Sequence, residues 1–436
     1  MNIQKKLHAK KHLIQQKKKN NNMGNLDFKK IIIVLLIPVV LIGVYFIFSF
    51  FKNKSSSSLD DLGTFFPFLS ESDTSGGNGV TSSDDLNLSN NNRLTADLIP
   101  ILRQITNTPV AGATIFKKEV DEESGEKTDY IIRYVERATG HIYETTANAL
   151  TQNRISNTTI PKIQEALWLD DKSLVIRYLD DNNTIKTFSA ELTGDDLANQ
   201  ELEGIFLQDN IQEIIKFGNG IFYLLESGSG SIGVNSDKRD ENKKIIFESP
   251  LKEWLIKNID DRYINFTTKP AINISGFSFL FDTKTESFDK IVGEKMNLST
   301  LTSNLLNILY SEYNKTGPQL FIYSNQEKTN TEVPLTTFPE KCVWNKKNTY
   351  LYCGVPSEKL SNNDLTKWYQ GLILFSDNIW RIDTENNATE FLVSPLEFET
   401  GDIDMIDLIL NKDENYLLFI NKIDYSLWGL KLEKEL

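Results

Sequence analysis

Residues 161–192 alternate between apolar and polar positions in a pattern that predicts one antiparallel meander. The stretch holds an apolar run, a turn, a strand, a second turn and an alternating strand, at residues 165–169, 170–171, 173–179, 180–183 and 184–192. Short turns rich in Asp and Asn between apolar runs are typical of β-hairpins.

Weaker copies of this meander recur through the C-terminal three quarters of the chain. Aligned on the middle strand of each copy, they are anchored at Ile131, Leu174, Ile221, Ile264, Leu309, Tyr350 and Leu417. The intervals are 43, 47, 43, 45, 41 and 67 residues. A repeat of about 40–50 residues is typical of a four-stranded propeller blade. The last interval contains an insertion at residues 357–370.

The seventh copy has only three strands before the chain stops, which would leave an exposed sheet edge. Residues 98–106 (LIPILRQIT) precede the first copy as residues 154–161 (RISNTTIP) precede the second. We therefore expect residues 98–106 to complete the C-terminal blade. The predicted fold is all-β: a seven-bladed β-propeller over residues 98–436. The fifth copy is the least regular, because residues 298–309 could equally begin as a helix.

The repeated pattern of a polar Asp- or Asn-containing turn followed by a strand such as SLVIRYL or NYLLFIN resembles the TolB-like and WD-repeat-like propellers of bacterial envelope proteins. The Ser-Pro-Asp-Gly turn of TolB-like repeats is replaced here by Leu-Asp-Asp-Lys, Asn-Ile-Asp-Asp and Asn-Lys-Asp-Glu, and no regular Trp-Asp or Gly-His signature is present. The resemblance implies a protein-interaction platform in the cell envelope.

The N-terminal part of the chain predicts a membrane anchor. Residues 1–30 form a Lys-rich arm, and the 21 residues from Ile31 to Phe51 are uncharged and almost wholly apolar. That length matches a transmembrane helix. A cleaved signal peptide is the alternative, but the apolar run is long and no small-residue cleavage site follows it. More Lys residues precede the apolar segment, in the arm, than follow it, where Lys52 and Lys54 lie. We therefore expect the N-terminus to be cytoplasmic and the propeller extracytoplasmic.

Residues 52–97 are rich in Ser, Asp, Gly and Asn and are predicted to be a flexible linker. One aromatic cluster interrupts this linker, formed by Phe65, Phe66 and Phe68. It is either a short docking peptide or membrane-interface anchor, or an apolar accident that packs loosely against the domain.

The charge is unevenly distributed. The net charge is -13, but residues 1–54 carry eleven Lys against one acid, Asp27, which leaves 36 basic and 59 acidic residues, or -23, for the remainder. Nucleic-acid surfaces need clustered Lys and Arg, so this acidic remainder argues against a nucleic-acid partner.

Cys342 and Cys353 are the two cysteines of the chain. An even-residue turn centred between Lys347 and Asn348 would place them directly opposite each other on paired antiparallel strands, within reach of a disulfide. A disulfide would persist outside the cytoplasm. The alternative is a pair of buried thiols.

No pattern in the sequence marks a catalytic, cofactor-binding or metal site. His8 and His12 lie in the arm, and a lone His141 remains for a catalytic triad or a zinc site. Paired acids such as Asp170 and Asp171 lack the spacing of a calcium loop and suit turn chemistry, although weak surface calcium stays open. We predict no enzymatic activity.

The insertion contains Trp368 and Tyr369, residue types that are common in binding hot spots. The alternative is that Trp368 packs against the blade edge. The predicted function is a protein-binding or scaffold module that engages an envelope protein or peptide. The alternative is a carbohydrate-binding or carbohydrate-active propeller that uses the central face of the ring. The lining of the central pocket should separate the two, because converging Asp, Glu, Trp and Tyr would favour a sugar.

Overall fold

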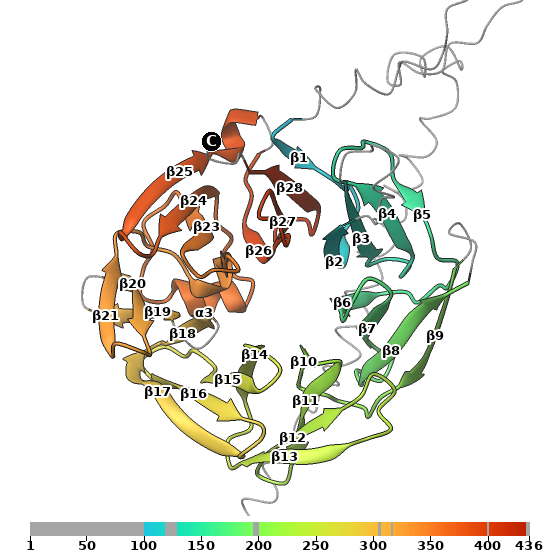
Figure 1. The fold of residues 1–436 in the computed structure, drawn as a ribbon, viewed down its shortest axis with the longest axis horizontal. Helices are drawn as coiled ribbons and strands as arrows, with labels where there is room; N and C mark the ends of the chain where they lie inside the picture. Colours follow the sequence, from blue (N-terminus) through green and yellow to red (C-terminus); the bar gives the residue numbers. More distant parts are fainter. Residues whose placement is uncertain are drawn as a thin grey trace, which may run out of the picture. The chain divides into compact units, whose positions relative to one another are not determined.

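The computed structural model describes residues 100–117, 129–194, 200–303, 307–314, 317–398 and 401–432, and these residues form seven four-stranded antiparallel sheets arranged in a ring (Figure 1). Blade 1 contains β2 (Val110–Lys117), β3 (Tyr130–Glu136), β4 (Ile142–Thr146) and β5 (Asn153–Arg154). Blade 2 contains β6 (Ile163–Trp168), β7 (Ser173–Leu179), β8 (Ile185–Thr193) and β9 (Glu201–Phe206). Blade 3 contains β10 (Glu213–Phe217), β11 (Gly220–Ser227), β12 (Gly230–Ser236) and β13 (Lys244–Ser249).

The remaining blades follow the same plan. Blade 4 contains β14 (Trp254–Asn258), β15 (Tyr263–Thr268), β16 (Ser275–Asp282) and β17 (Ser287–Met296). Blade 5 contains β18 (Ser299–Thr302), β19 (Asn307–Asn314), β20 (Gly317–Ser324) and β21 (Thr329–Val333). Blade 6 contains β22 (Cys342–Trp344), β23 (Tyr350–Pro356), β24 (Asp377–Asp383) and β25 (Ala388–Val393). Blade 7 contains β26 (Met405–Leu410), β27 (Tyr416–Asn421), β28 (Leu427–Lys431) and β1 (Leu102–Gln104).

The predicted seven-bladed propeller is confirmed. Each of the seven anchor positions of the repeat falls on the second strand of a different blade. These second strands are the most buried: β11 and β27 each have six consecutive buried residues. They run as continuous apolar segments because both of their faces pack against neighbouring blades.

The predicted closure of the ring is also confirmed. Strand β1 pairs antiparallel with β28, with Leu102 opposite Leu430 and Gln104 opposite Trp428. The outer edge of the last blade is therefore supplied by the first strand that the structure describes. Figure 1 shows β1 lying beside β28 at the outside of the ring.

Apolar side chains between adjacent blades form the core. The cluster between blades 3 and 4 is aromatic, with Phe247 and Phe266 at 4.3 Å between ring centroids and Trp254 edge-on to Phe266 at 5.7 Å. Tilted and edge-on ring pairs add to the stabilisation that burial itself provides.

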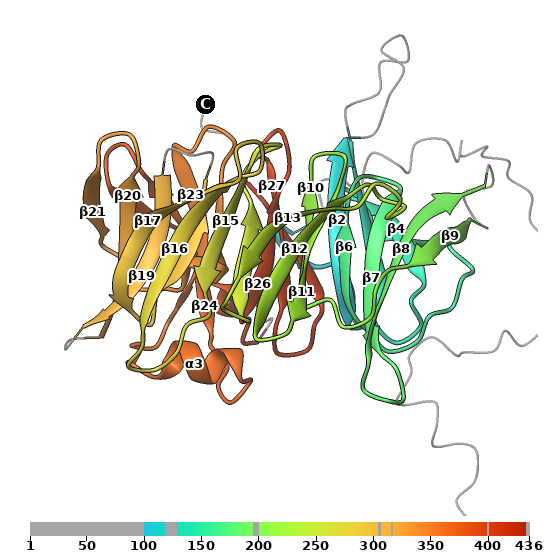
Figure 2. The ribbon, with the colours of Figure 1, turned by 90° about the horizontal axis from the view of Figure 1, so that it is seen from below.

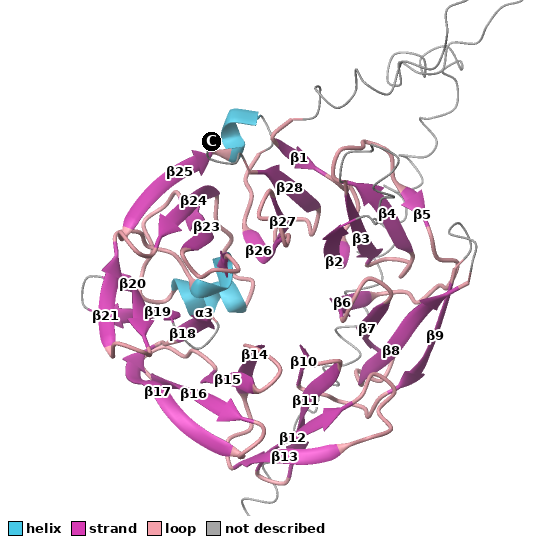
Figure 3. Cartoon of the chain, in the orientation of Figure 1, coloured by secondary structure: helices cyan, strands magenta, loops and turns pink. Residues whose placement is uncertain are grey.

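The irregular parts of the repeat adopt specific structures. The fifth copy begins with the short strand β18 and not with a helix over its described residues. The insertion in blade 6 contains one α-helix, α3 (Asp364–Tyr369). Figure 2 shows α3 on one face of the ring, beyond the strand ends, and Figure 3 shows it as a helix among strands and loops.

The predicted arm, membrane helix and linker, residues 1–97, lie outside the described residues, as do Phe65, Phe66 and Phe68. Within the part of the chain that the structure describes, no helix has both the length and the apolar character needed to cross a membrane.

Candidate binding site in the central channel

A cavity of about 290 Å³ lies on the axis of the ring, between the inner strands of blades 3 to 7. Its apolar wall includes Leu255, Ile256, Leu301, Val343 and Leu408. Its titratable groups are Glu213, Lys257, Glu340, Tyr369 and Asp407. Residues on inner strands come from positions that are distant in sequence but meet at the axis of a propeller. The cavity therefore brings three carboxylates, one ammonium and one phenol together.

Asp407 lies in a β-bulge between Ile406 and Ile409, with a φ of 51°. A bulge of this kind redirects a side chain relative to its strand. Asp407 is exposed, yet protein groups surround its carboxylate. The crowding of its carboxylate by protein groups raises the pKa of Asp407, and the nearby charge of Lys257 opposes the shift.

Glu213 is the first residue of the inner strand β10. Burial raises the pKa of its carboxyl group, Lys269 opposes the shift, and the nearby charge of Glu165 adds to it. Glu165 itself pairs with Arg177 at 2.6 Å. A bound cation would stabilise such a carboxylate, because it would offset both the lost hydration and the repulsion from the neighbouring acids.

Glu340 lies in the 3₁₀-helix η4 (Pro339–Lys341), directly before β22. Its Oε1 accepts hydrogen bonds from Ser299 Oγ, at 2.5 Å, and from the Tyr369 hydroxyl. Its buried Oε2 has no hydrogen-bond partner among the described residues. Although Tyr369 is partly exposed, protein groups that crowd its hydroxyl raise its pKa well above its usual value, and the charge of Glu340 adds to the shift. The phenol thus remains a hydrogen-bond donor that points at a carboxylate.

Helix α3 is held against this site by a buried charged network. Lys341 Nζ donates to Asp377 Oδ2 at 2.6 Å and also to Asp404, and all three side chains are fully buried. Trp368 Nε1 donates to both carboxylate oxygens of Asp404, at 3.0 and 2.9 Å. Lys422 Nζ lies 3.6 Å from the centroid of the Trp368 ring and donates to the Trp368 carbonyl oxygen. These contacts fix the C-terminal end of α3, and so the position of Tyr369.

The two neighbouring aromatic residues of the insertion, Trp368 and Tyr369, have different environments. Trp368 is only 4% exposed and packs beside Phe338 and Phe375, whereas Tyr369 is 41% exposed at the cavity. Trp368 therefore has the position that the packing alternative requires, and Tyr369 remains available to a ligand.

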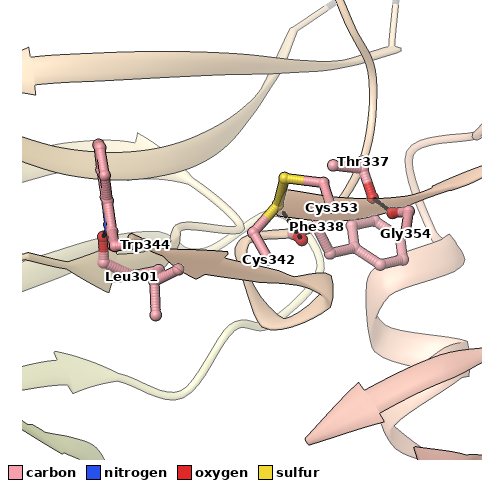
Figure 4. Close-up of a disulfide and its surroundings, with 7 residues drawn as sticks. All are labelled: Leu301, Thr337, Phe338, Cys342, Trp344, Cys353 and Gly354. Carbon is pink, nitrogen blue, oxygen red and sulfur yellow. Dashed lines mark hydrogen bonds between the residues drawn. A yellow bond between two sulfur atoms is a disulfide. The ribbon is translucent and has the colours of Figure 1, made fainter. Parts of the chain in front are cut away.

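The predicted disulfide between Cys342 and Cys353 is confirmed, and the two residues are directly opposed on β22 and β23 (Figure 4). Figure 4 also shows the hydrogen bonds that flank it, from Thr337 Oγ1 to the Gly354 carbonyl oxygen and from Trp344 Nε1 to the Leu301 carbonyl oxygen. The disulfide joins the inner strand of blade 6, which carries part of the cavity wall, to the second strand.

The acidic turns accept backbone N–H groups. Asp170 accepts from the N–H groups of Lys172 and Ser173, and Asp260 accepts from those of Arg262 and Tyr263. Side chains that bond their own turn in this way are typical of Asx turns. Among the described residues, no group of three or more His, Cys, Asp or Glu side chains is arranged to hold a metal ion.

The sequence pattern does not identify the three channel carboxylates. Glu213, Glu340 and Asp407 lie on or just before the first strand of their blades, and that position in the repeat was the available signal. It was weak, because period-two patterning tells which residues share a face but not which of 59 acids meet at the axis.

No family model matches the chain, and none of the curated proteins matches it. Solved structures with a similar fold include TolB from Acinetobacter baumannii, at 8% identity and a TM-score of 0.38 over 74% of this chain and 80% of that one. The Swd1 β-propeller domain of Myceliophteria thermophila matches at 8% identity and a TM-score of 0.45, over 76% of this chain and 100% of that one. The tricorn protease matches at 12% identity and a TM-score of 0.33. The match covers 67% of this chain but only 27% of the protease.

These likenesses concern the fold alone. The strand topology itself shows that the described residues form a seven-bladed β-propeller, which is the fold that the expected resemblance to TolB-like and WD-repeat-like propellers implied.

Proposed function

We propose that the propeller is a membrane-tethered, extracytoplasmic binding module whose central channel takes up a basic segment of an envelope protein or peptide. The observation that carries this proposal is the meeting of Glu213, Glu340 and Asp407, from blades 3, 6 and 7, in one cavity that holds a single ammonium, that of Lys257.

The electrostatics favour a cationic ligand. The pKa values of Glu213 and Asp407 are raised chiefly because protein groups crowd their carboxylates, although Glu213 is only half-buried and Asp407 is exposed. A Lys or Arg tip would supply hydrogen bonds to them and to Oε2 of Glu340, which has no hydrogen-bond partner among the residues that the structure describes. The net charge of -23 outside the first 54 residues would also steer a basic partner towards the domain.

Calorimetric titration of the full-length chain in lipid nanodiscs tests the proposal with two defined probes, a Lys- and Arg-rich peptide and an acidic peptide of equal length. We expect binding of the basic peptide alone. Asp407→Asn removes one charge and keeps a residue type that tolerates positive φ. The loss of a charged hydrogen bond costs about 1.5–3 kcal/mol, so the affinity should fall roughly 10- to 150-fold.

Asp181→Asn, at an exposed turn of blade 2, is the matched control and should bind as the wild type does. Equal affinity of Asp407→Asn and the wild type would contradict the channel as the binding site.

A carbohydrate-active propeller is the second candidate. Glycoside hydrolysis uses a carboxylic acid with a raised pKa near a second carboxylate, and Glu213 and Asp407 both have raised pKa values. The cavity also offers the Tyr369 ring, but within the described part of the chain no Trp side chain contributes to its lining. Release of reducing ends from cell-envelope polysaccharide by the wild type, abolished in Asp407→Asn, would favour this candidate over peptide binding.

The membrane tether is tested separately. Protease added to intact cells should remove the propeller while leaving the Lys-rich arm protected. Protection of the propeller would overturn the proposed orientation.

A further inference from the structure

The buried network under α3 joins three chain segments. Lys341 ends η4 ahead of blade 6, Asp377 begins β24 in the same blade, and Asp404 directly precedes β26 of blade 7. The side chains of all three are fully buried, and an ammonium is in hydrogen-bond contact with two carboxylates.

This network is fully buried beside aromatic rings. Lys341 Nζ lies 5.2 Å from the centroid of the Trp368 ring and 5.4 Å from that of Phe375. Charges taken out of water carry a large solvation penalty, which attraction within an ion pair offsets only in part. Any reaction that converts the pair into a neutral group would therefore be favoured here more than in water.

The two carboxyl groups differ in their partners. Asp404 is held by N–H donors on both oxygens, from Trp368 Nε1 and from the backbone of Phe375 at 3.1 Å. Asp377 accepts from the backbone N–H of Met405 at 2.7 Å through Oδ2, but its buried Oδ1 has no partner among the described residues. Asp404 is thus fixed and polarised, while Asp377 keeps one oxygen free to carry a proton.

We propose that Lys341 and Asp404 condense into an intramolecular isopeptide bond, with Asp377 as the proton carrier. Asp377 takes a proton from the Lys341 ammonium, and the free amine attacks Cγ of Asp404. The Nζ–Cγ bond forms and one Cγ–O bond breaks. Asp377 returns its proton to the departing oxygen, which leaves as water with this and a second ammonium proton, and the third stays on the amide nitrogen. The step needs no oxidant, cofactor or further reactant.

The protonation of Asp377 supports this role. Burial raises its pKa to about 6, although Lys341 opposes the shift. An acid that can be neutral or charged near neutral pH is suited to accept and return a proton. The donors on Asp404 would stabilise the oxyanion that forms during the attack.

The bond would link blade 6 to blade 7 beside the disulfide, since Lys341 is adjacent to Cys342. It would anchor the residues that carry Glu340 and Tyr369, yet it does not depend on what the channel binds.

Mass spectrometry of the full-length wild-type chain, reduced, alkylated and denatured, tests the proposal without any variant. We expect the intact mass to fall short of the linear chain by one water. A protease digest should contain a branched peptide that joins Lys341 to Asp404, and trypsin should not cleave after Lys341. The exposed ion pair of Lys252 and Glu226 serves as an internal control that remains unlinked.

Asp377→Asn keeps both reacting groups and removes the proton carrier, so the branched peptide should be lost from a chain that is still full length. A wild-type mass equal to that of the linear chain, or trypsin cleavage after Lys341, would overturn the proposal. A link mapped to Asp377 in place of Asp404 would overturn the assignment of roles.

Discussion

The backbone N–H of Leu427 donates to Thr106 Oγ1 at 3.0 Å, although the two residues are 321 positions apart in the sequence. The neighbouring N–H of Ile105 donates to the carbonyl oxygen of Leu427 at 2.7 Å. A strand from the start of the domain thereby completes the blade at its end. A ring closed in this way has no chain connection across the joint, so hydrogen bonds and packing must hold it.

Leu102 is the buried residue of that joint, and its truncation should weaken the whole ring. Leu102→Ala removes a side chain that is 2% exposed and packs into the cluster between blades 6 and 7. Substitutions of this kind cost about 2–5 kcal/mol, and we expect thermal unfolding to shift to lower temperature. The adjacent Ile101 is 45% exposed, so Ile101→Ala is a matched control with little expected effect. Identical unfolding curves for the two variants would refute closure as the source of stability.

Trp368 and Tyr369 should differ in their effects although they are neighbours. Trp368→Ala empties a buried site and removes two hydrogen bonds to Asp404, so we expect a loss of about 3–5 kcal/mol in thermal or denaturant unfolding. Tyr369→Phe removes only the hydroxyl that donates to Glu340 and should unfold like the wild type. If the channel is the binding site, Tyr369→Phe should instead alter the affinity for the basic peptide. A Tyr369→Phe variant with lowered stability and unchanged affinity would argue against a packing role for Trp368 and a binding role for Tyr369.

The low pKa of Asp170 should make the folded protein less stable in acid. Burial alone would raise its pKa, but hydrogen bonds from Lys238 in blade 3 and from the backbone of Ser173 and Lys172 outweigh this and lower it to about 2. The unfolded value is about 3.9, so the folded state binds the proton more weakly. The stabilisation is present above pH 4 and is lost as the pH falls from about 4 to about 2.

Both side chains of the Asp170–Lys238 pair are about a third exposed, so solvent screening reduces the effect to about 1 kcal/mol. Unfolding of Asp170→Asn measured across this range should depend less on pH than that of the wild type. The exposed neighbour Asp171→Asn is the control and should keep the wild-type slope.

The Cys342–Cys353 disulfide should stabilise the hairpin at the channel wall. The two residues are separated by 11 positions, and closing a loop of that length in the unfolded chain contributes about 2–3 kcal/mol. A Cys342→Ala and Cys353→Ala double variant should therefore unfold at a lower temperature. A reducing agent should lower the unfolding temperature of the wild type towards that of the double variant. No effect of reductant on wild-type unfolding would contradict a structural role for this bond.

The sequence by itself determined the number of blades, the position of the second strand in each blade, the strand that closes the ring and the cysteine pairing. These features depend on short-range alternation and on turn residues, and the backbone enforces them within each hairpin. The disulfide followed from register alone, because directly opposed residues on paired strands are within bonding distance.

Only the tertiary structure decided which side chains meet at the axis and under α3. Glu213, Glu340 and Asp407 converge because inner strands of different blades face one axis, and Asp407 is turned into the channel by a bulge. Lys341 reaches Asp377 and Asp404 because one helix covers the junction of two blades. Such contacts join residues whose separation carries no periodic signal, so they follow from the curvature of the ring and the packing of the insertion and not from the pattern along the chain.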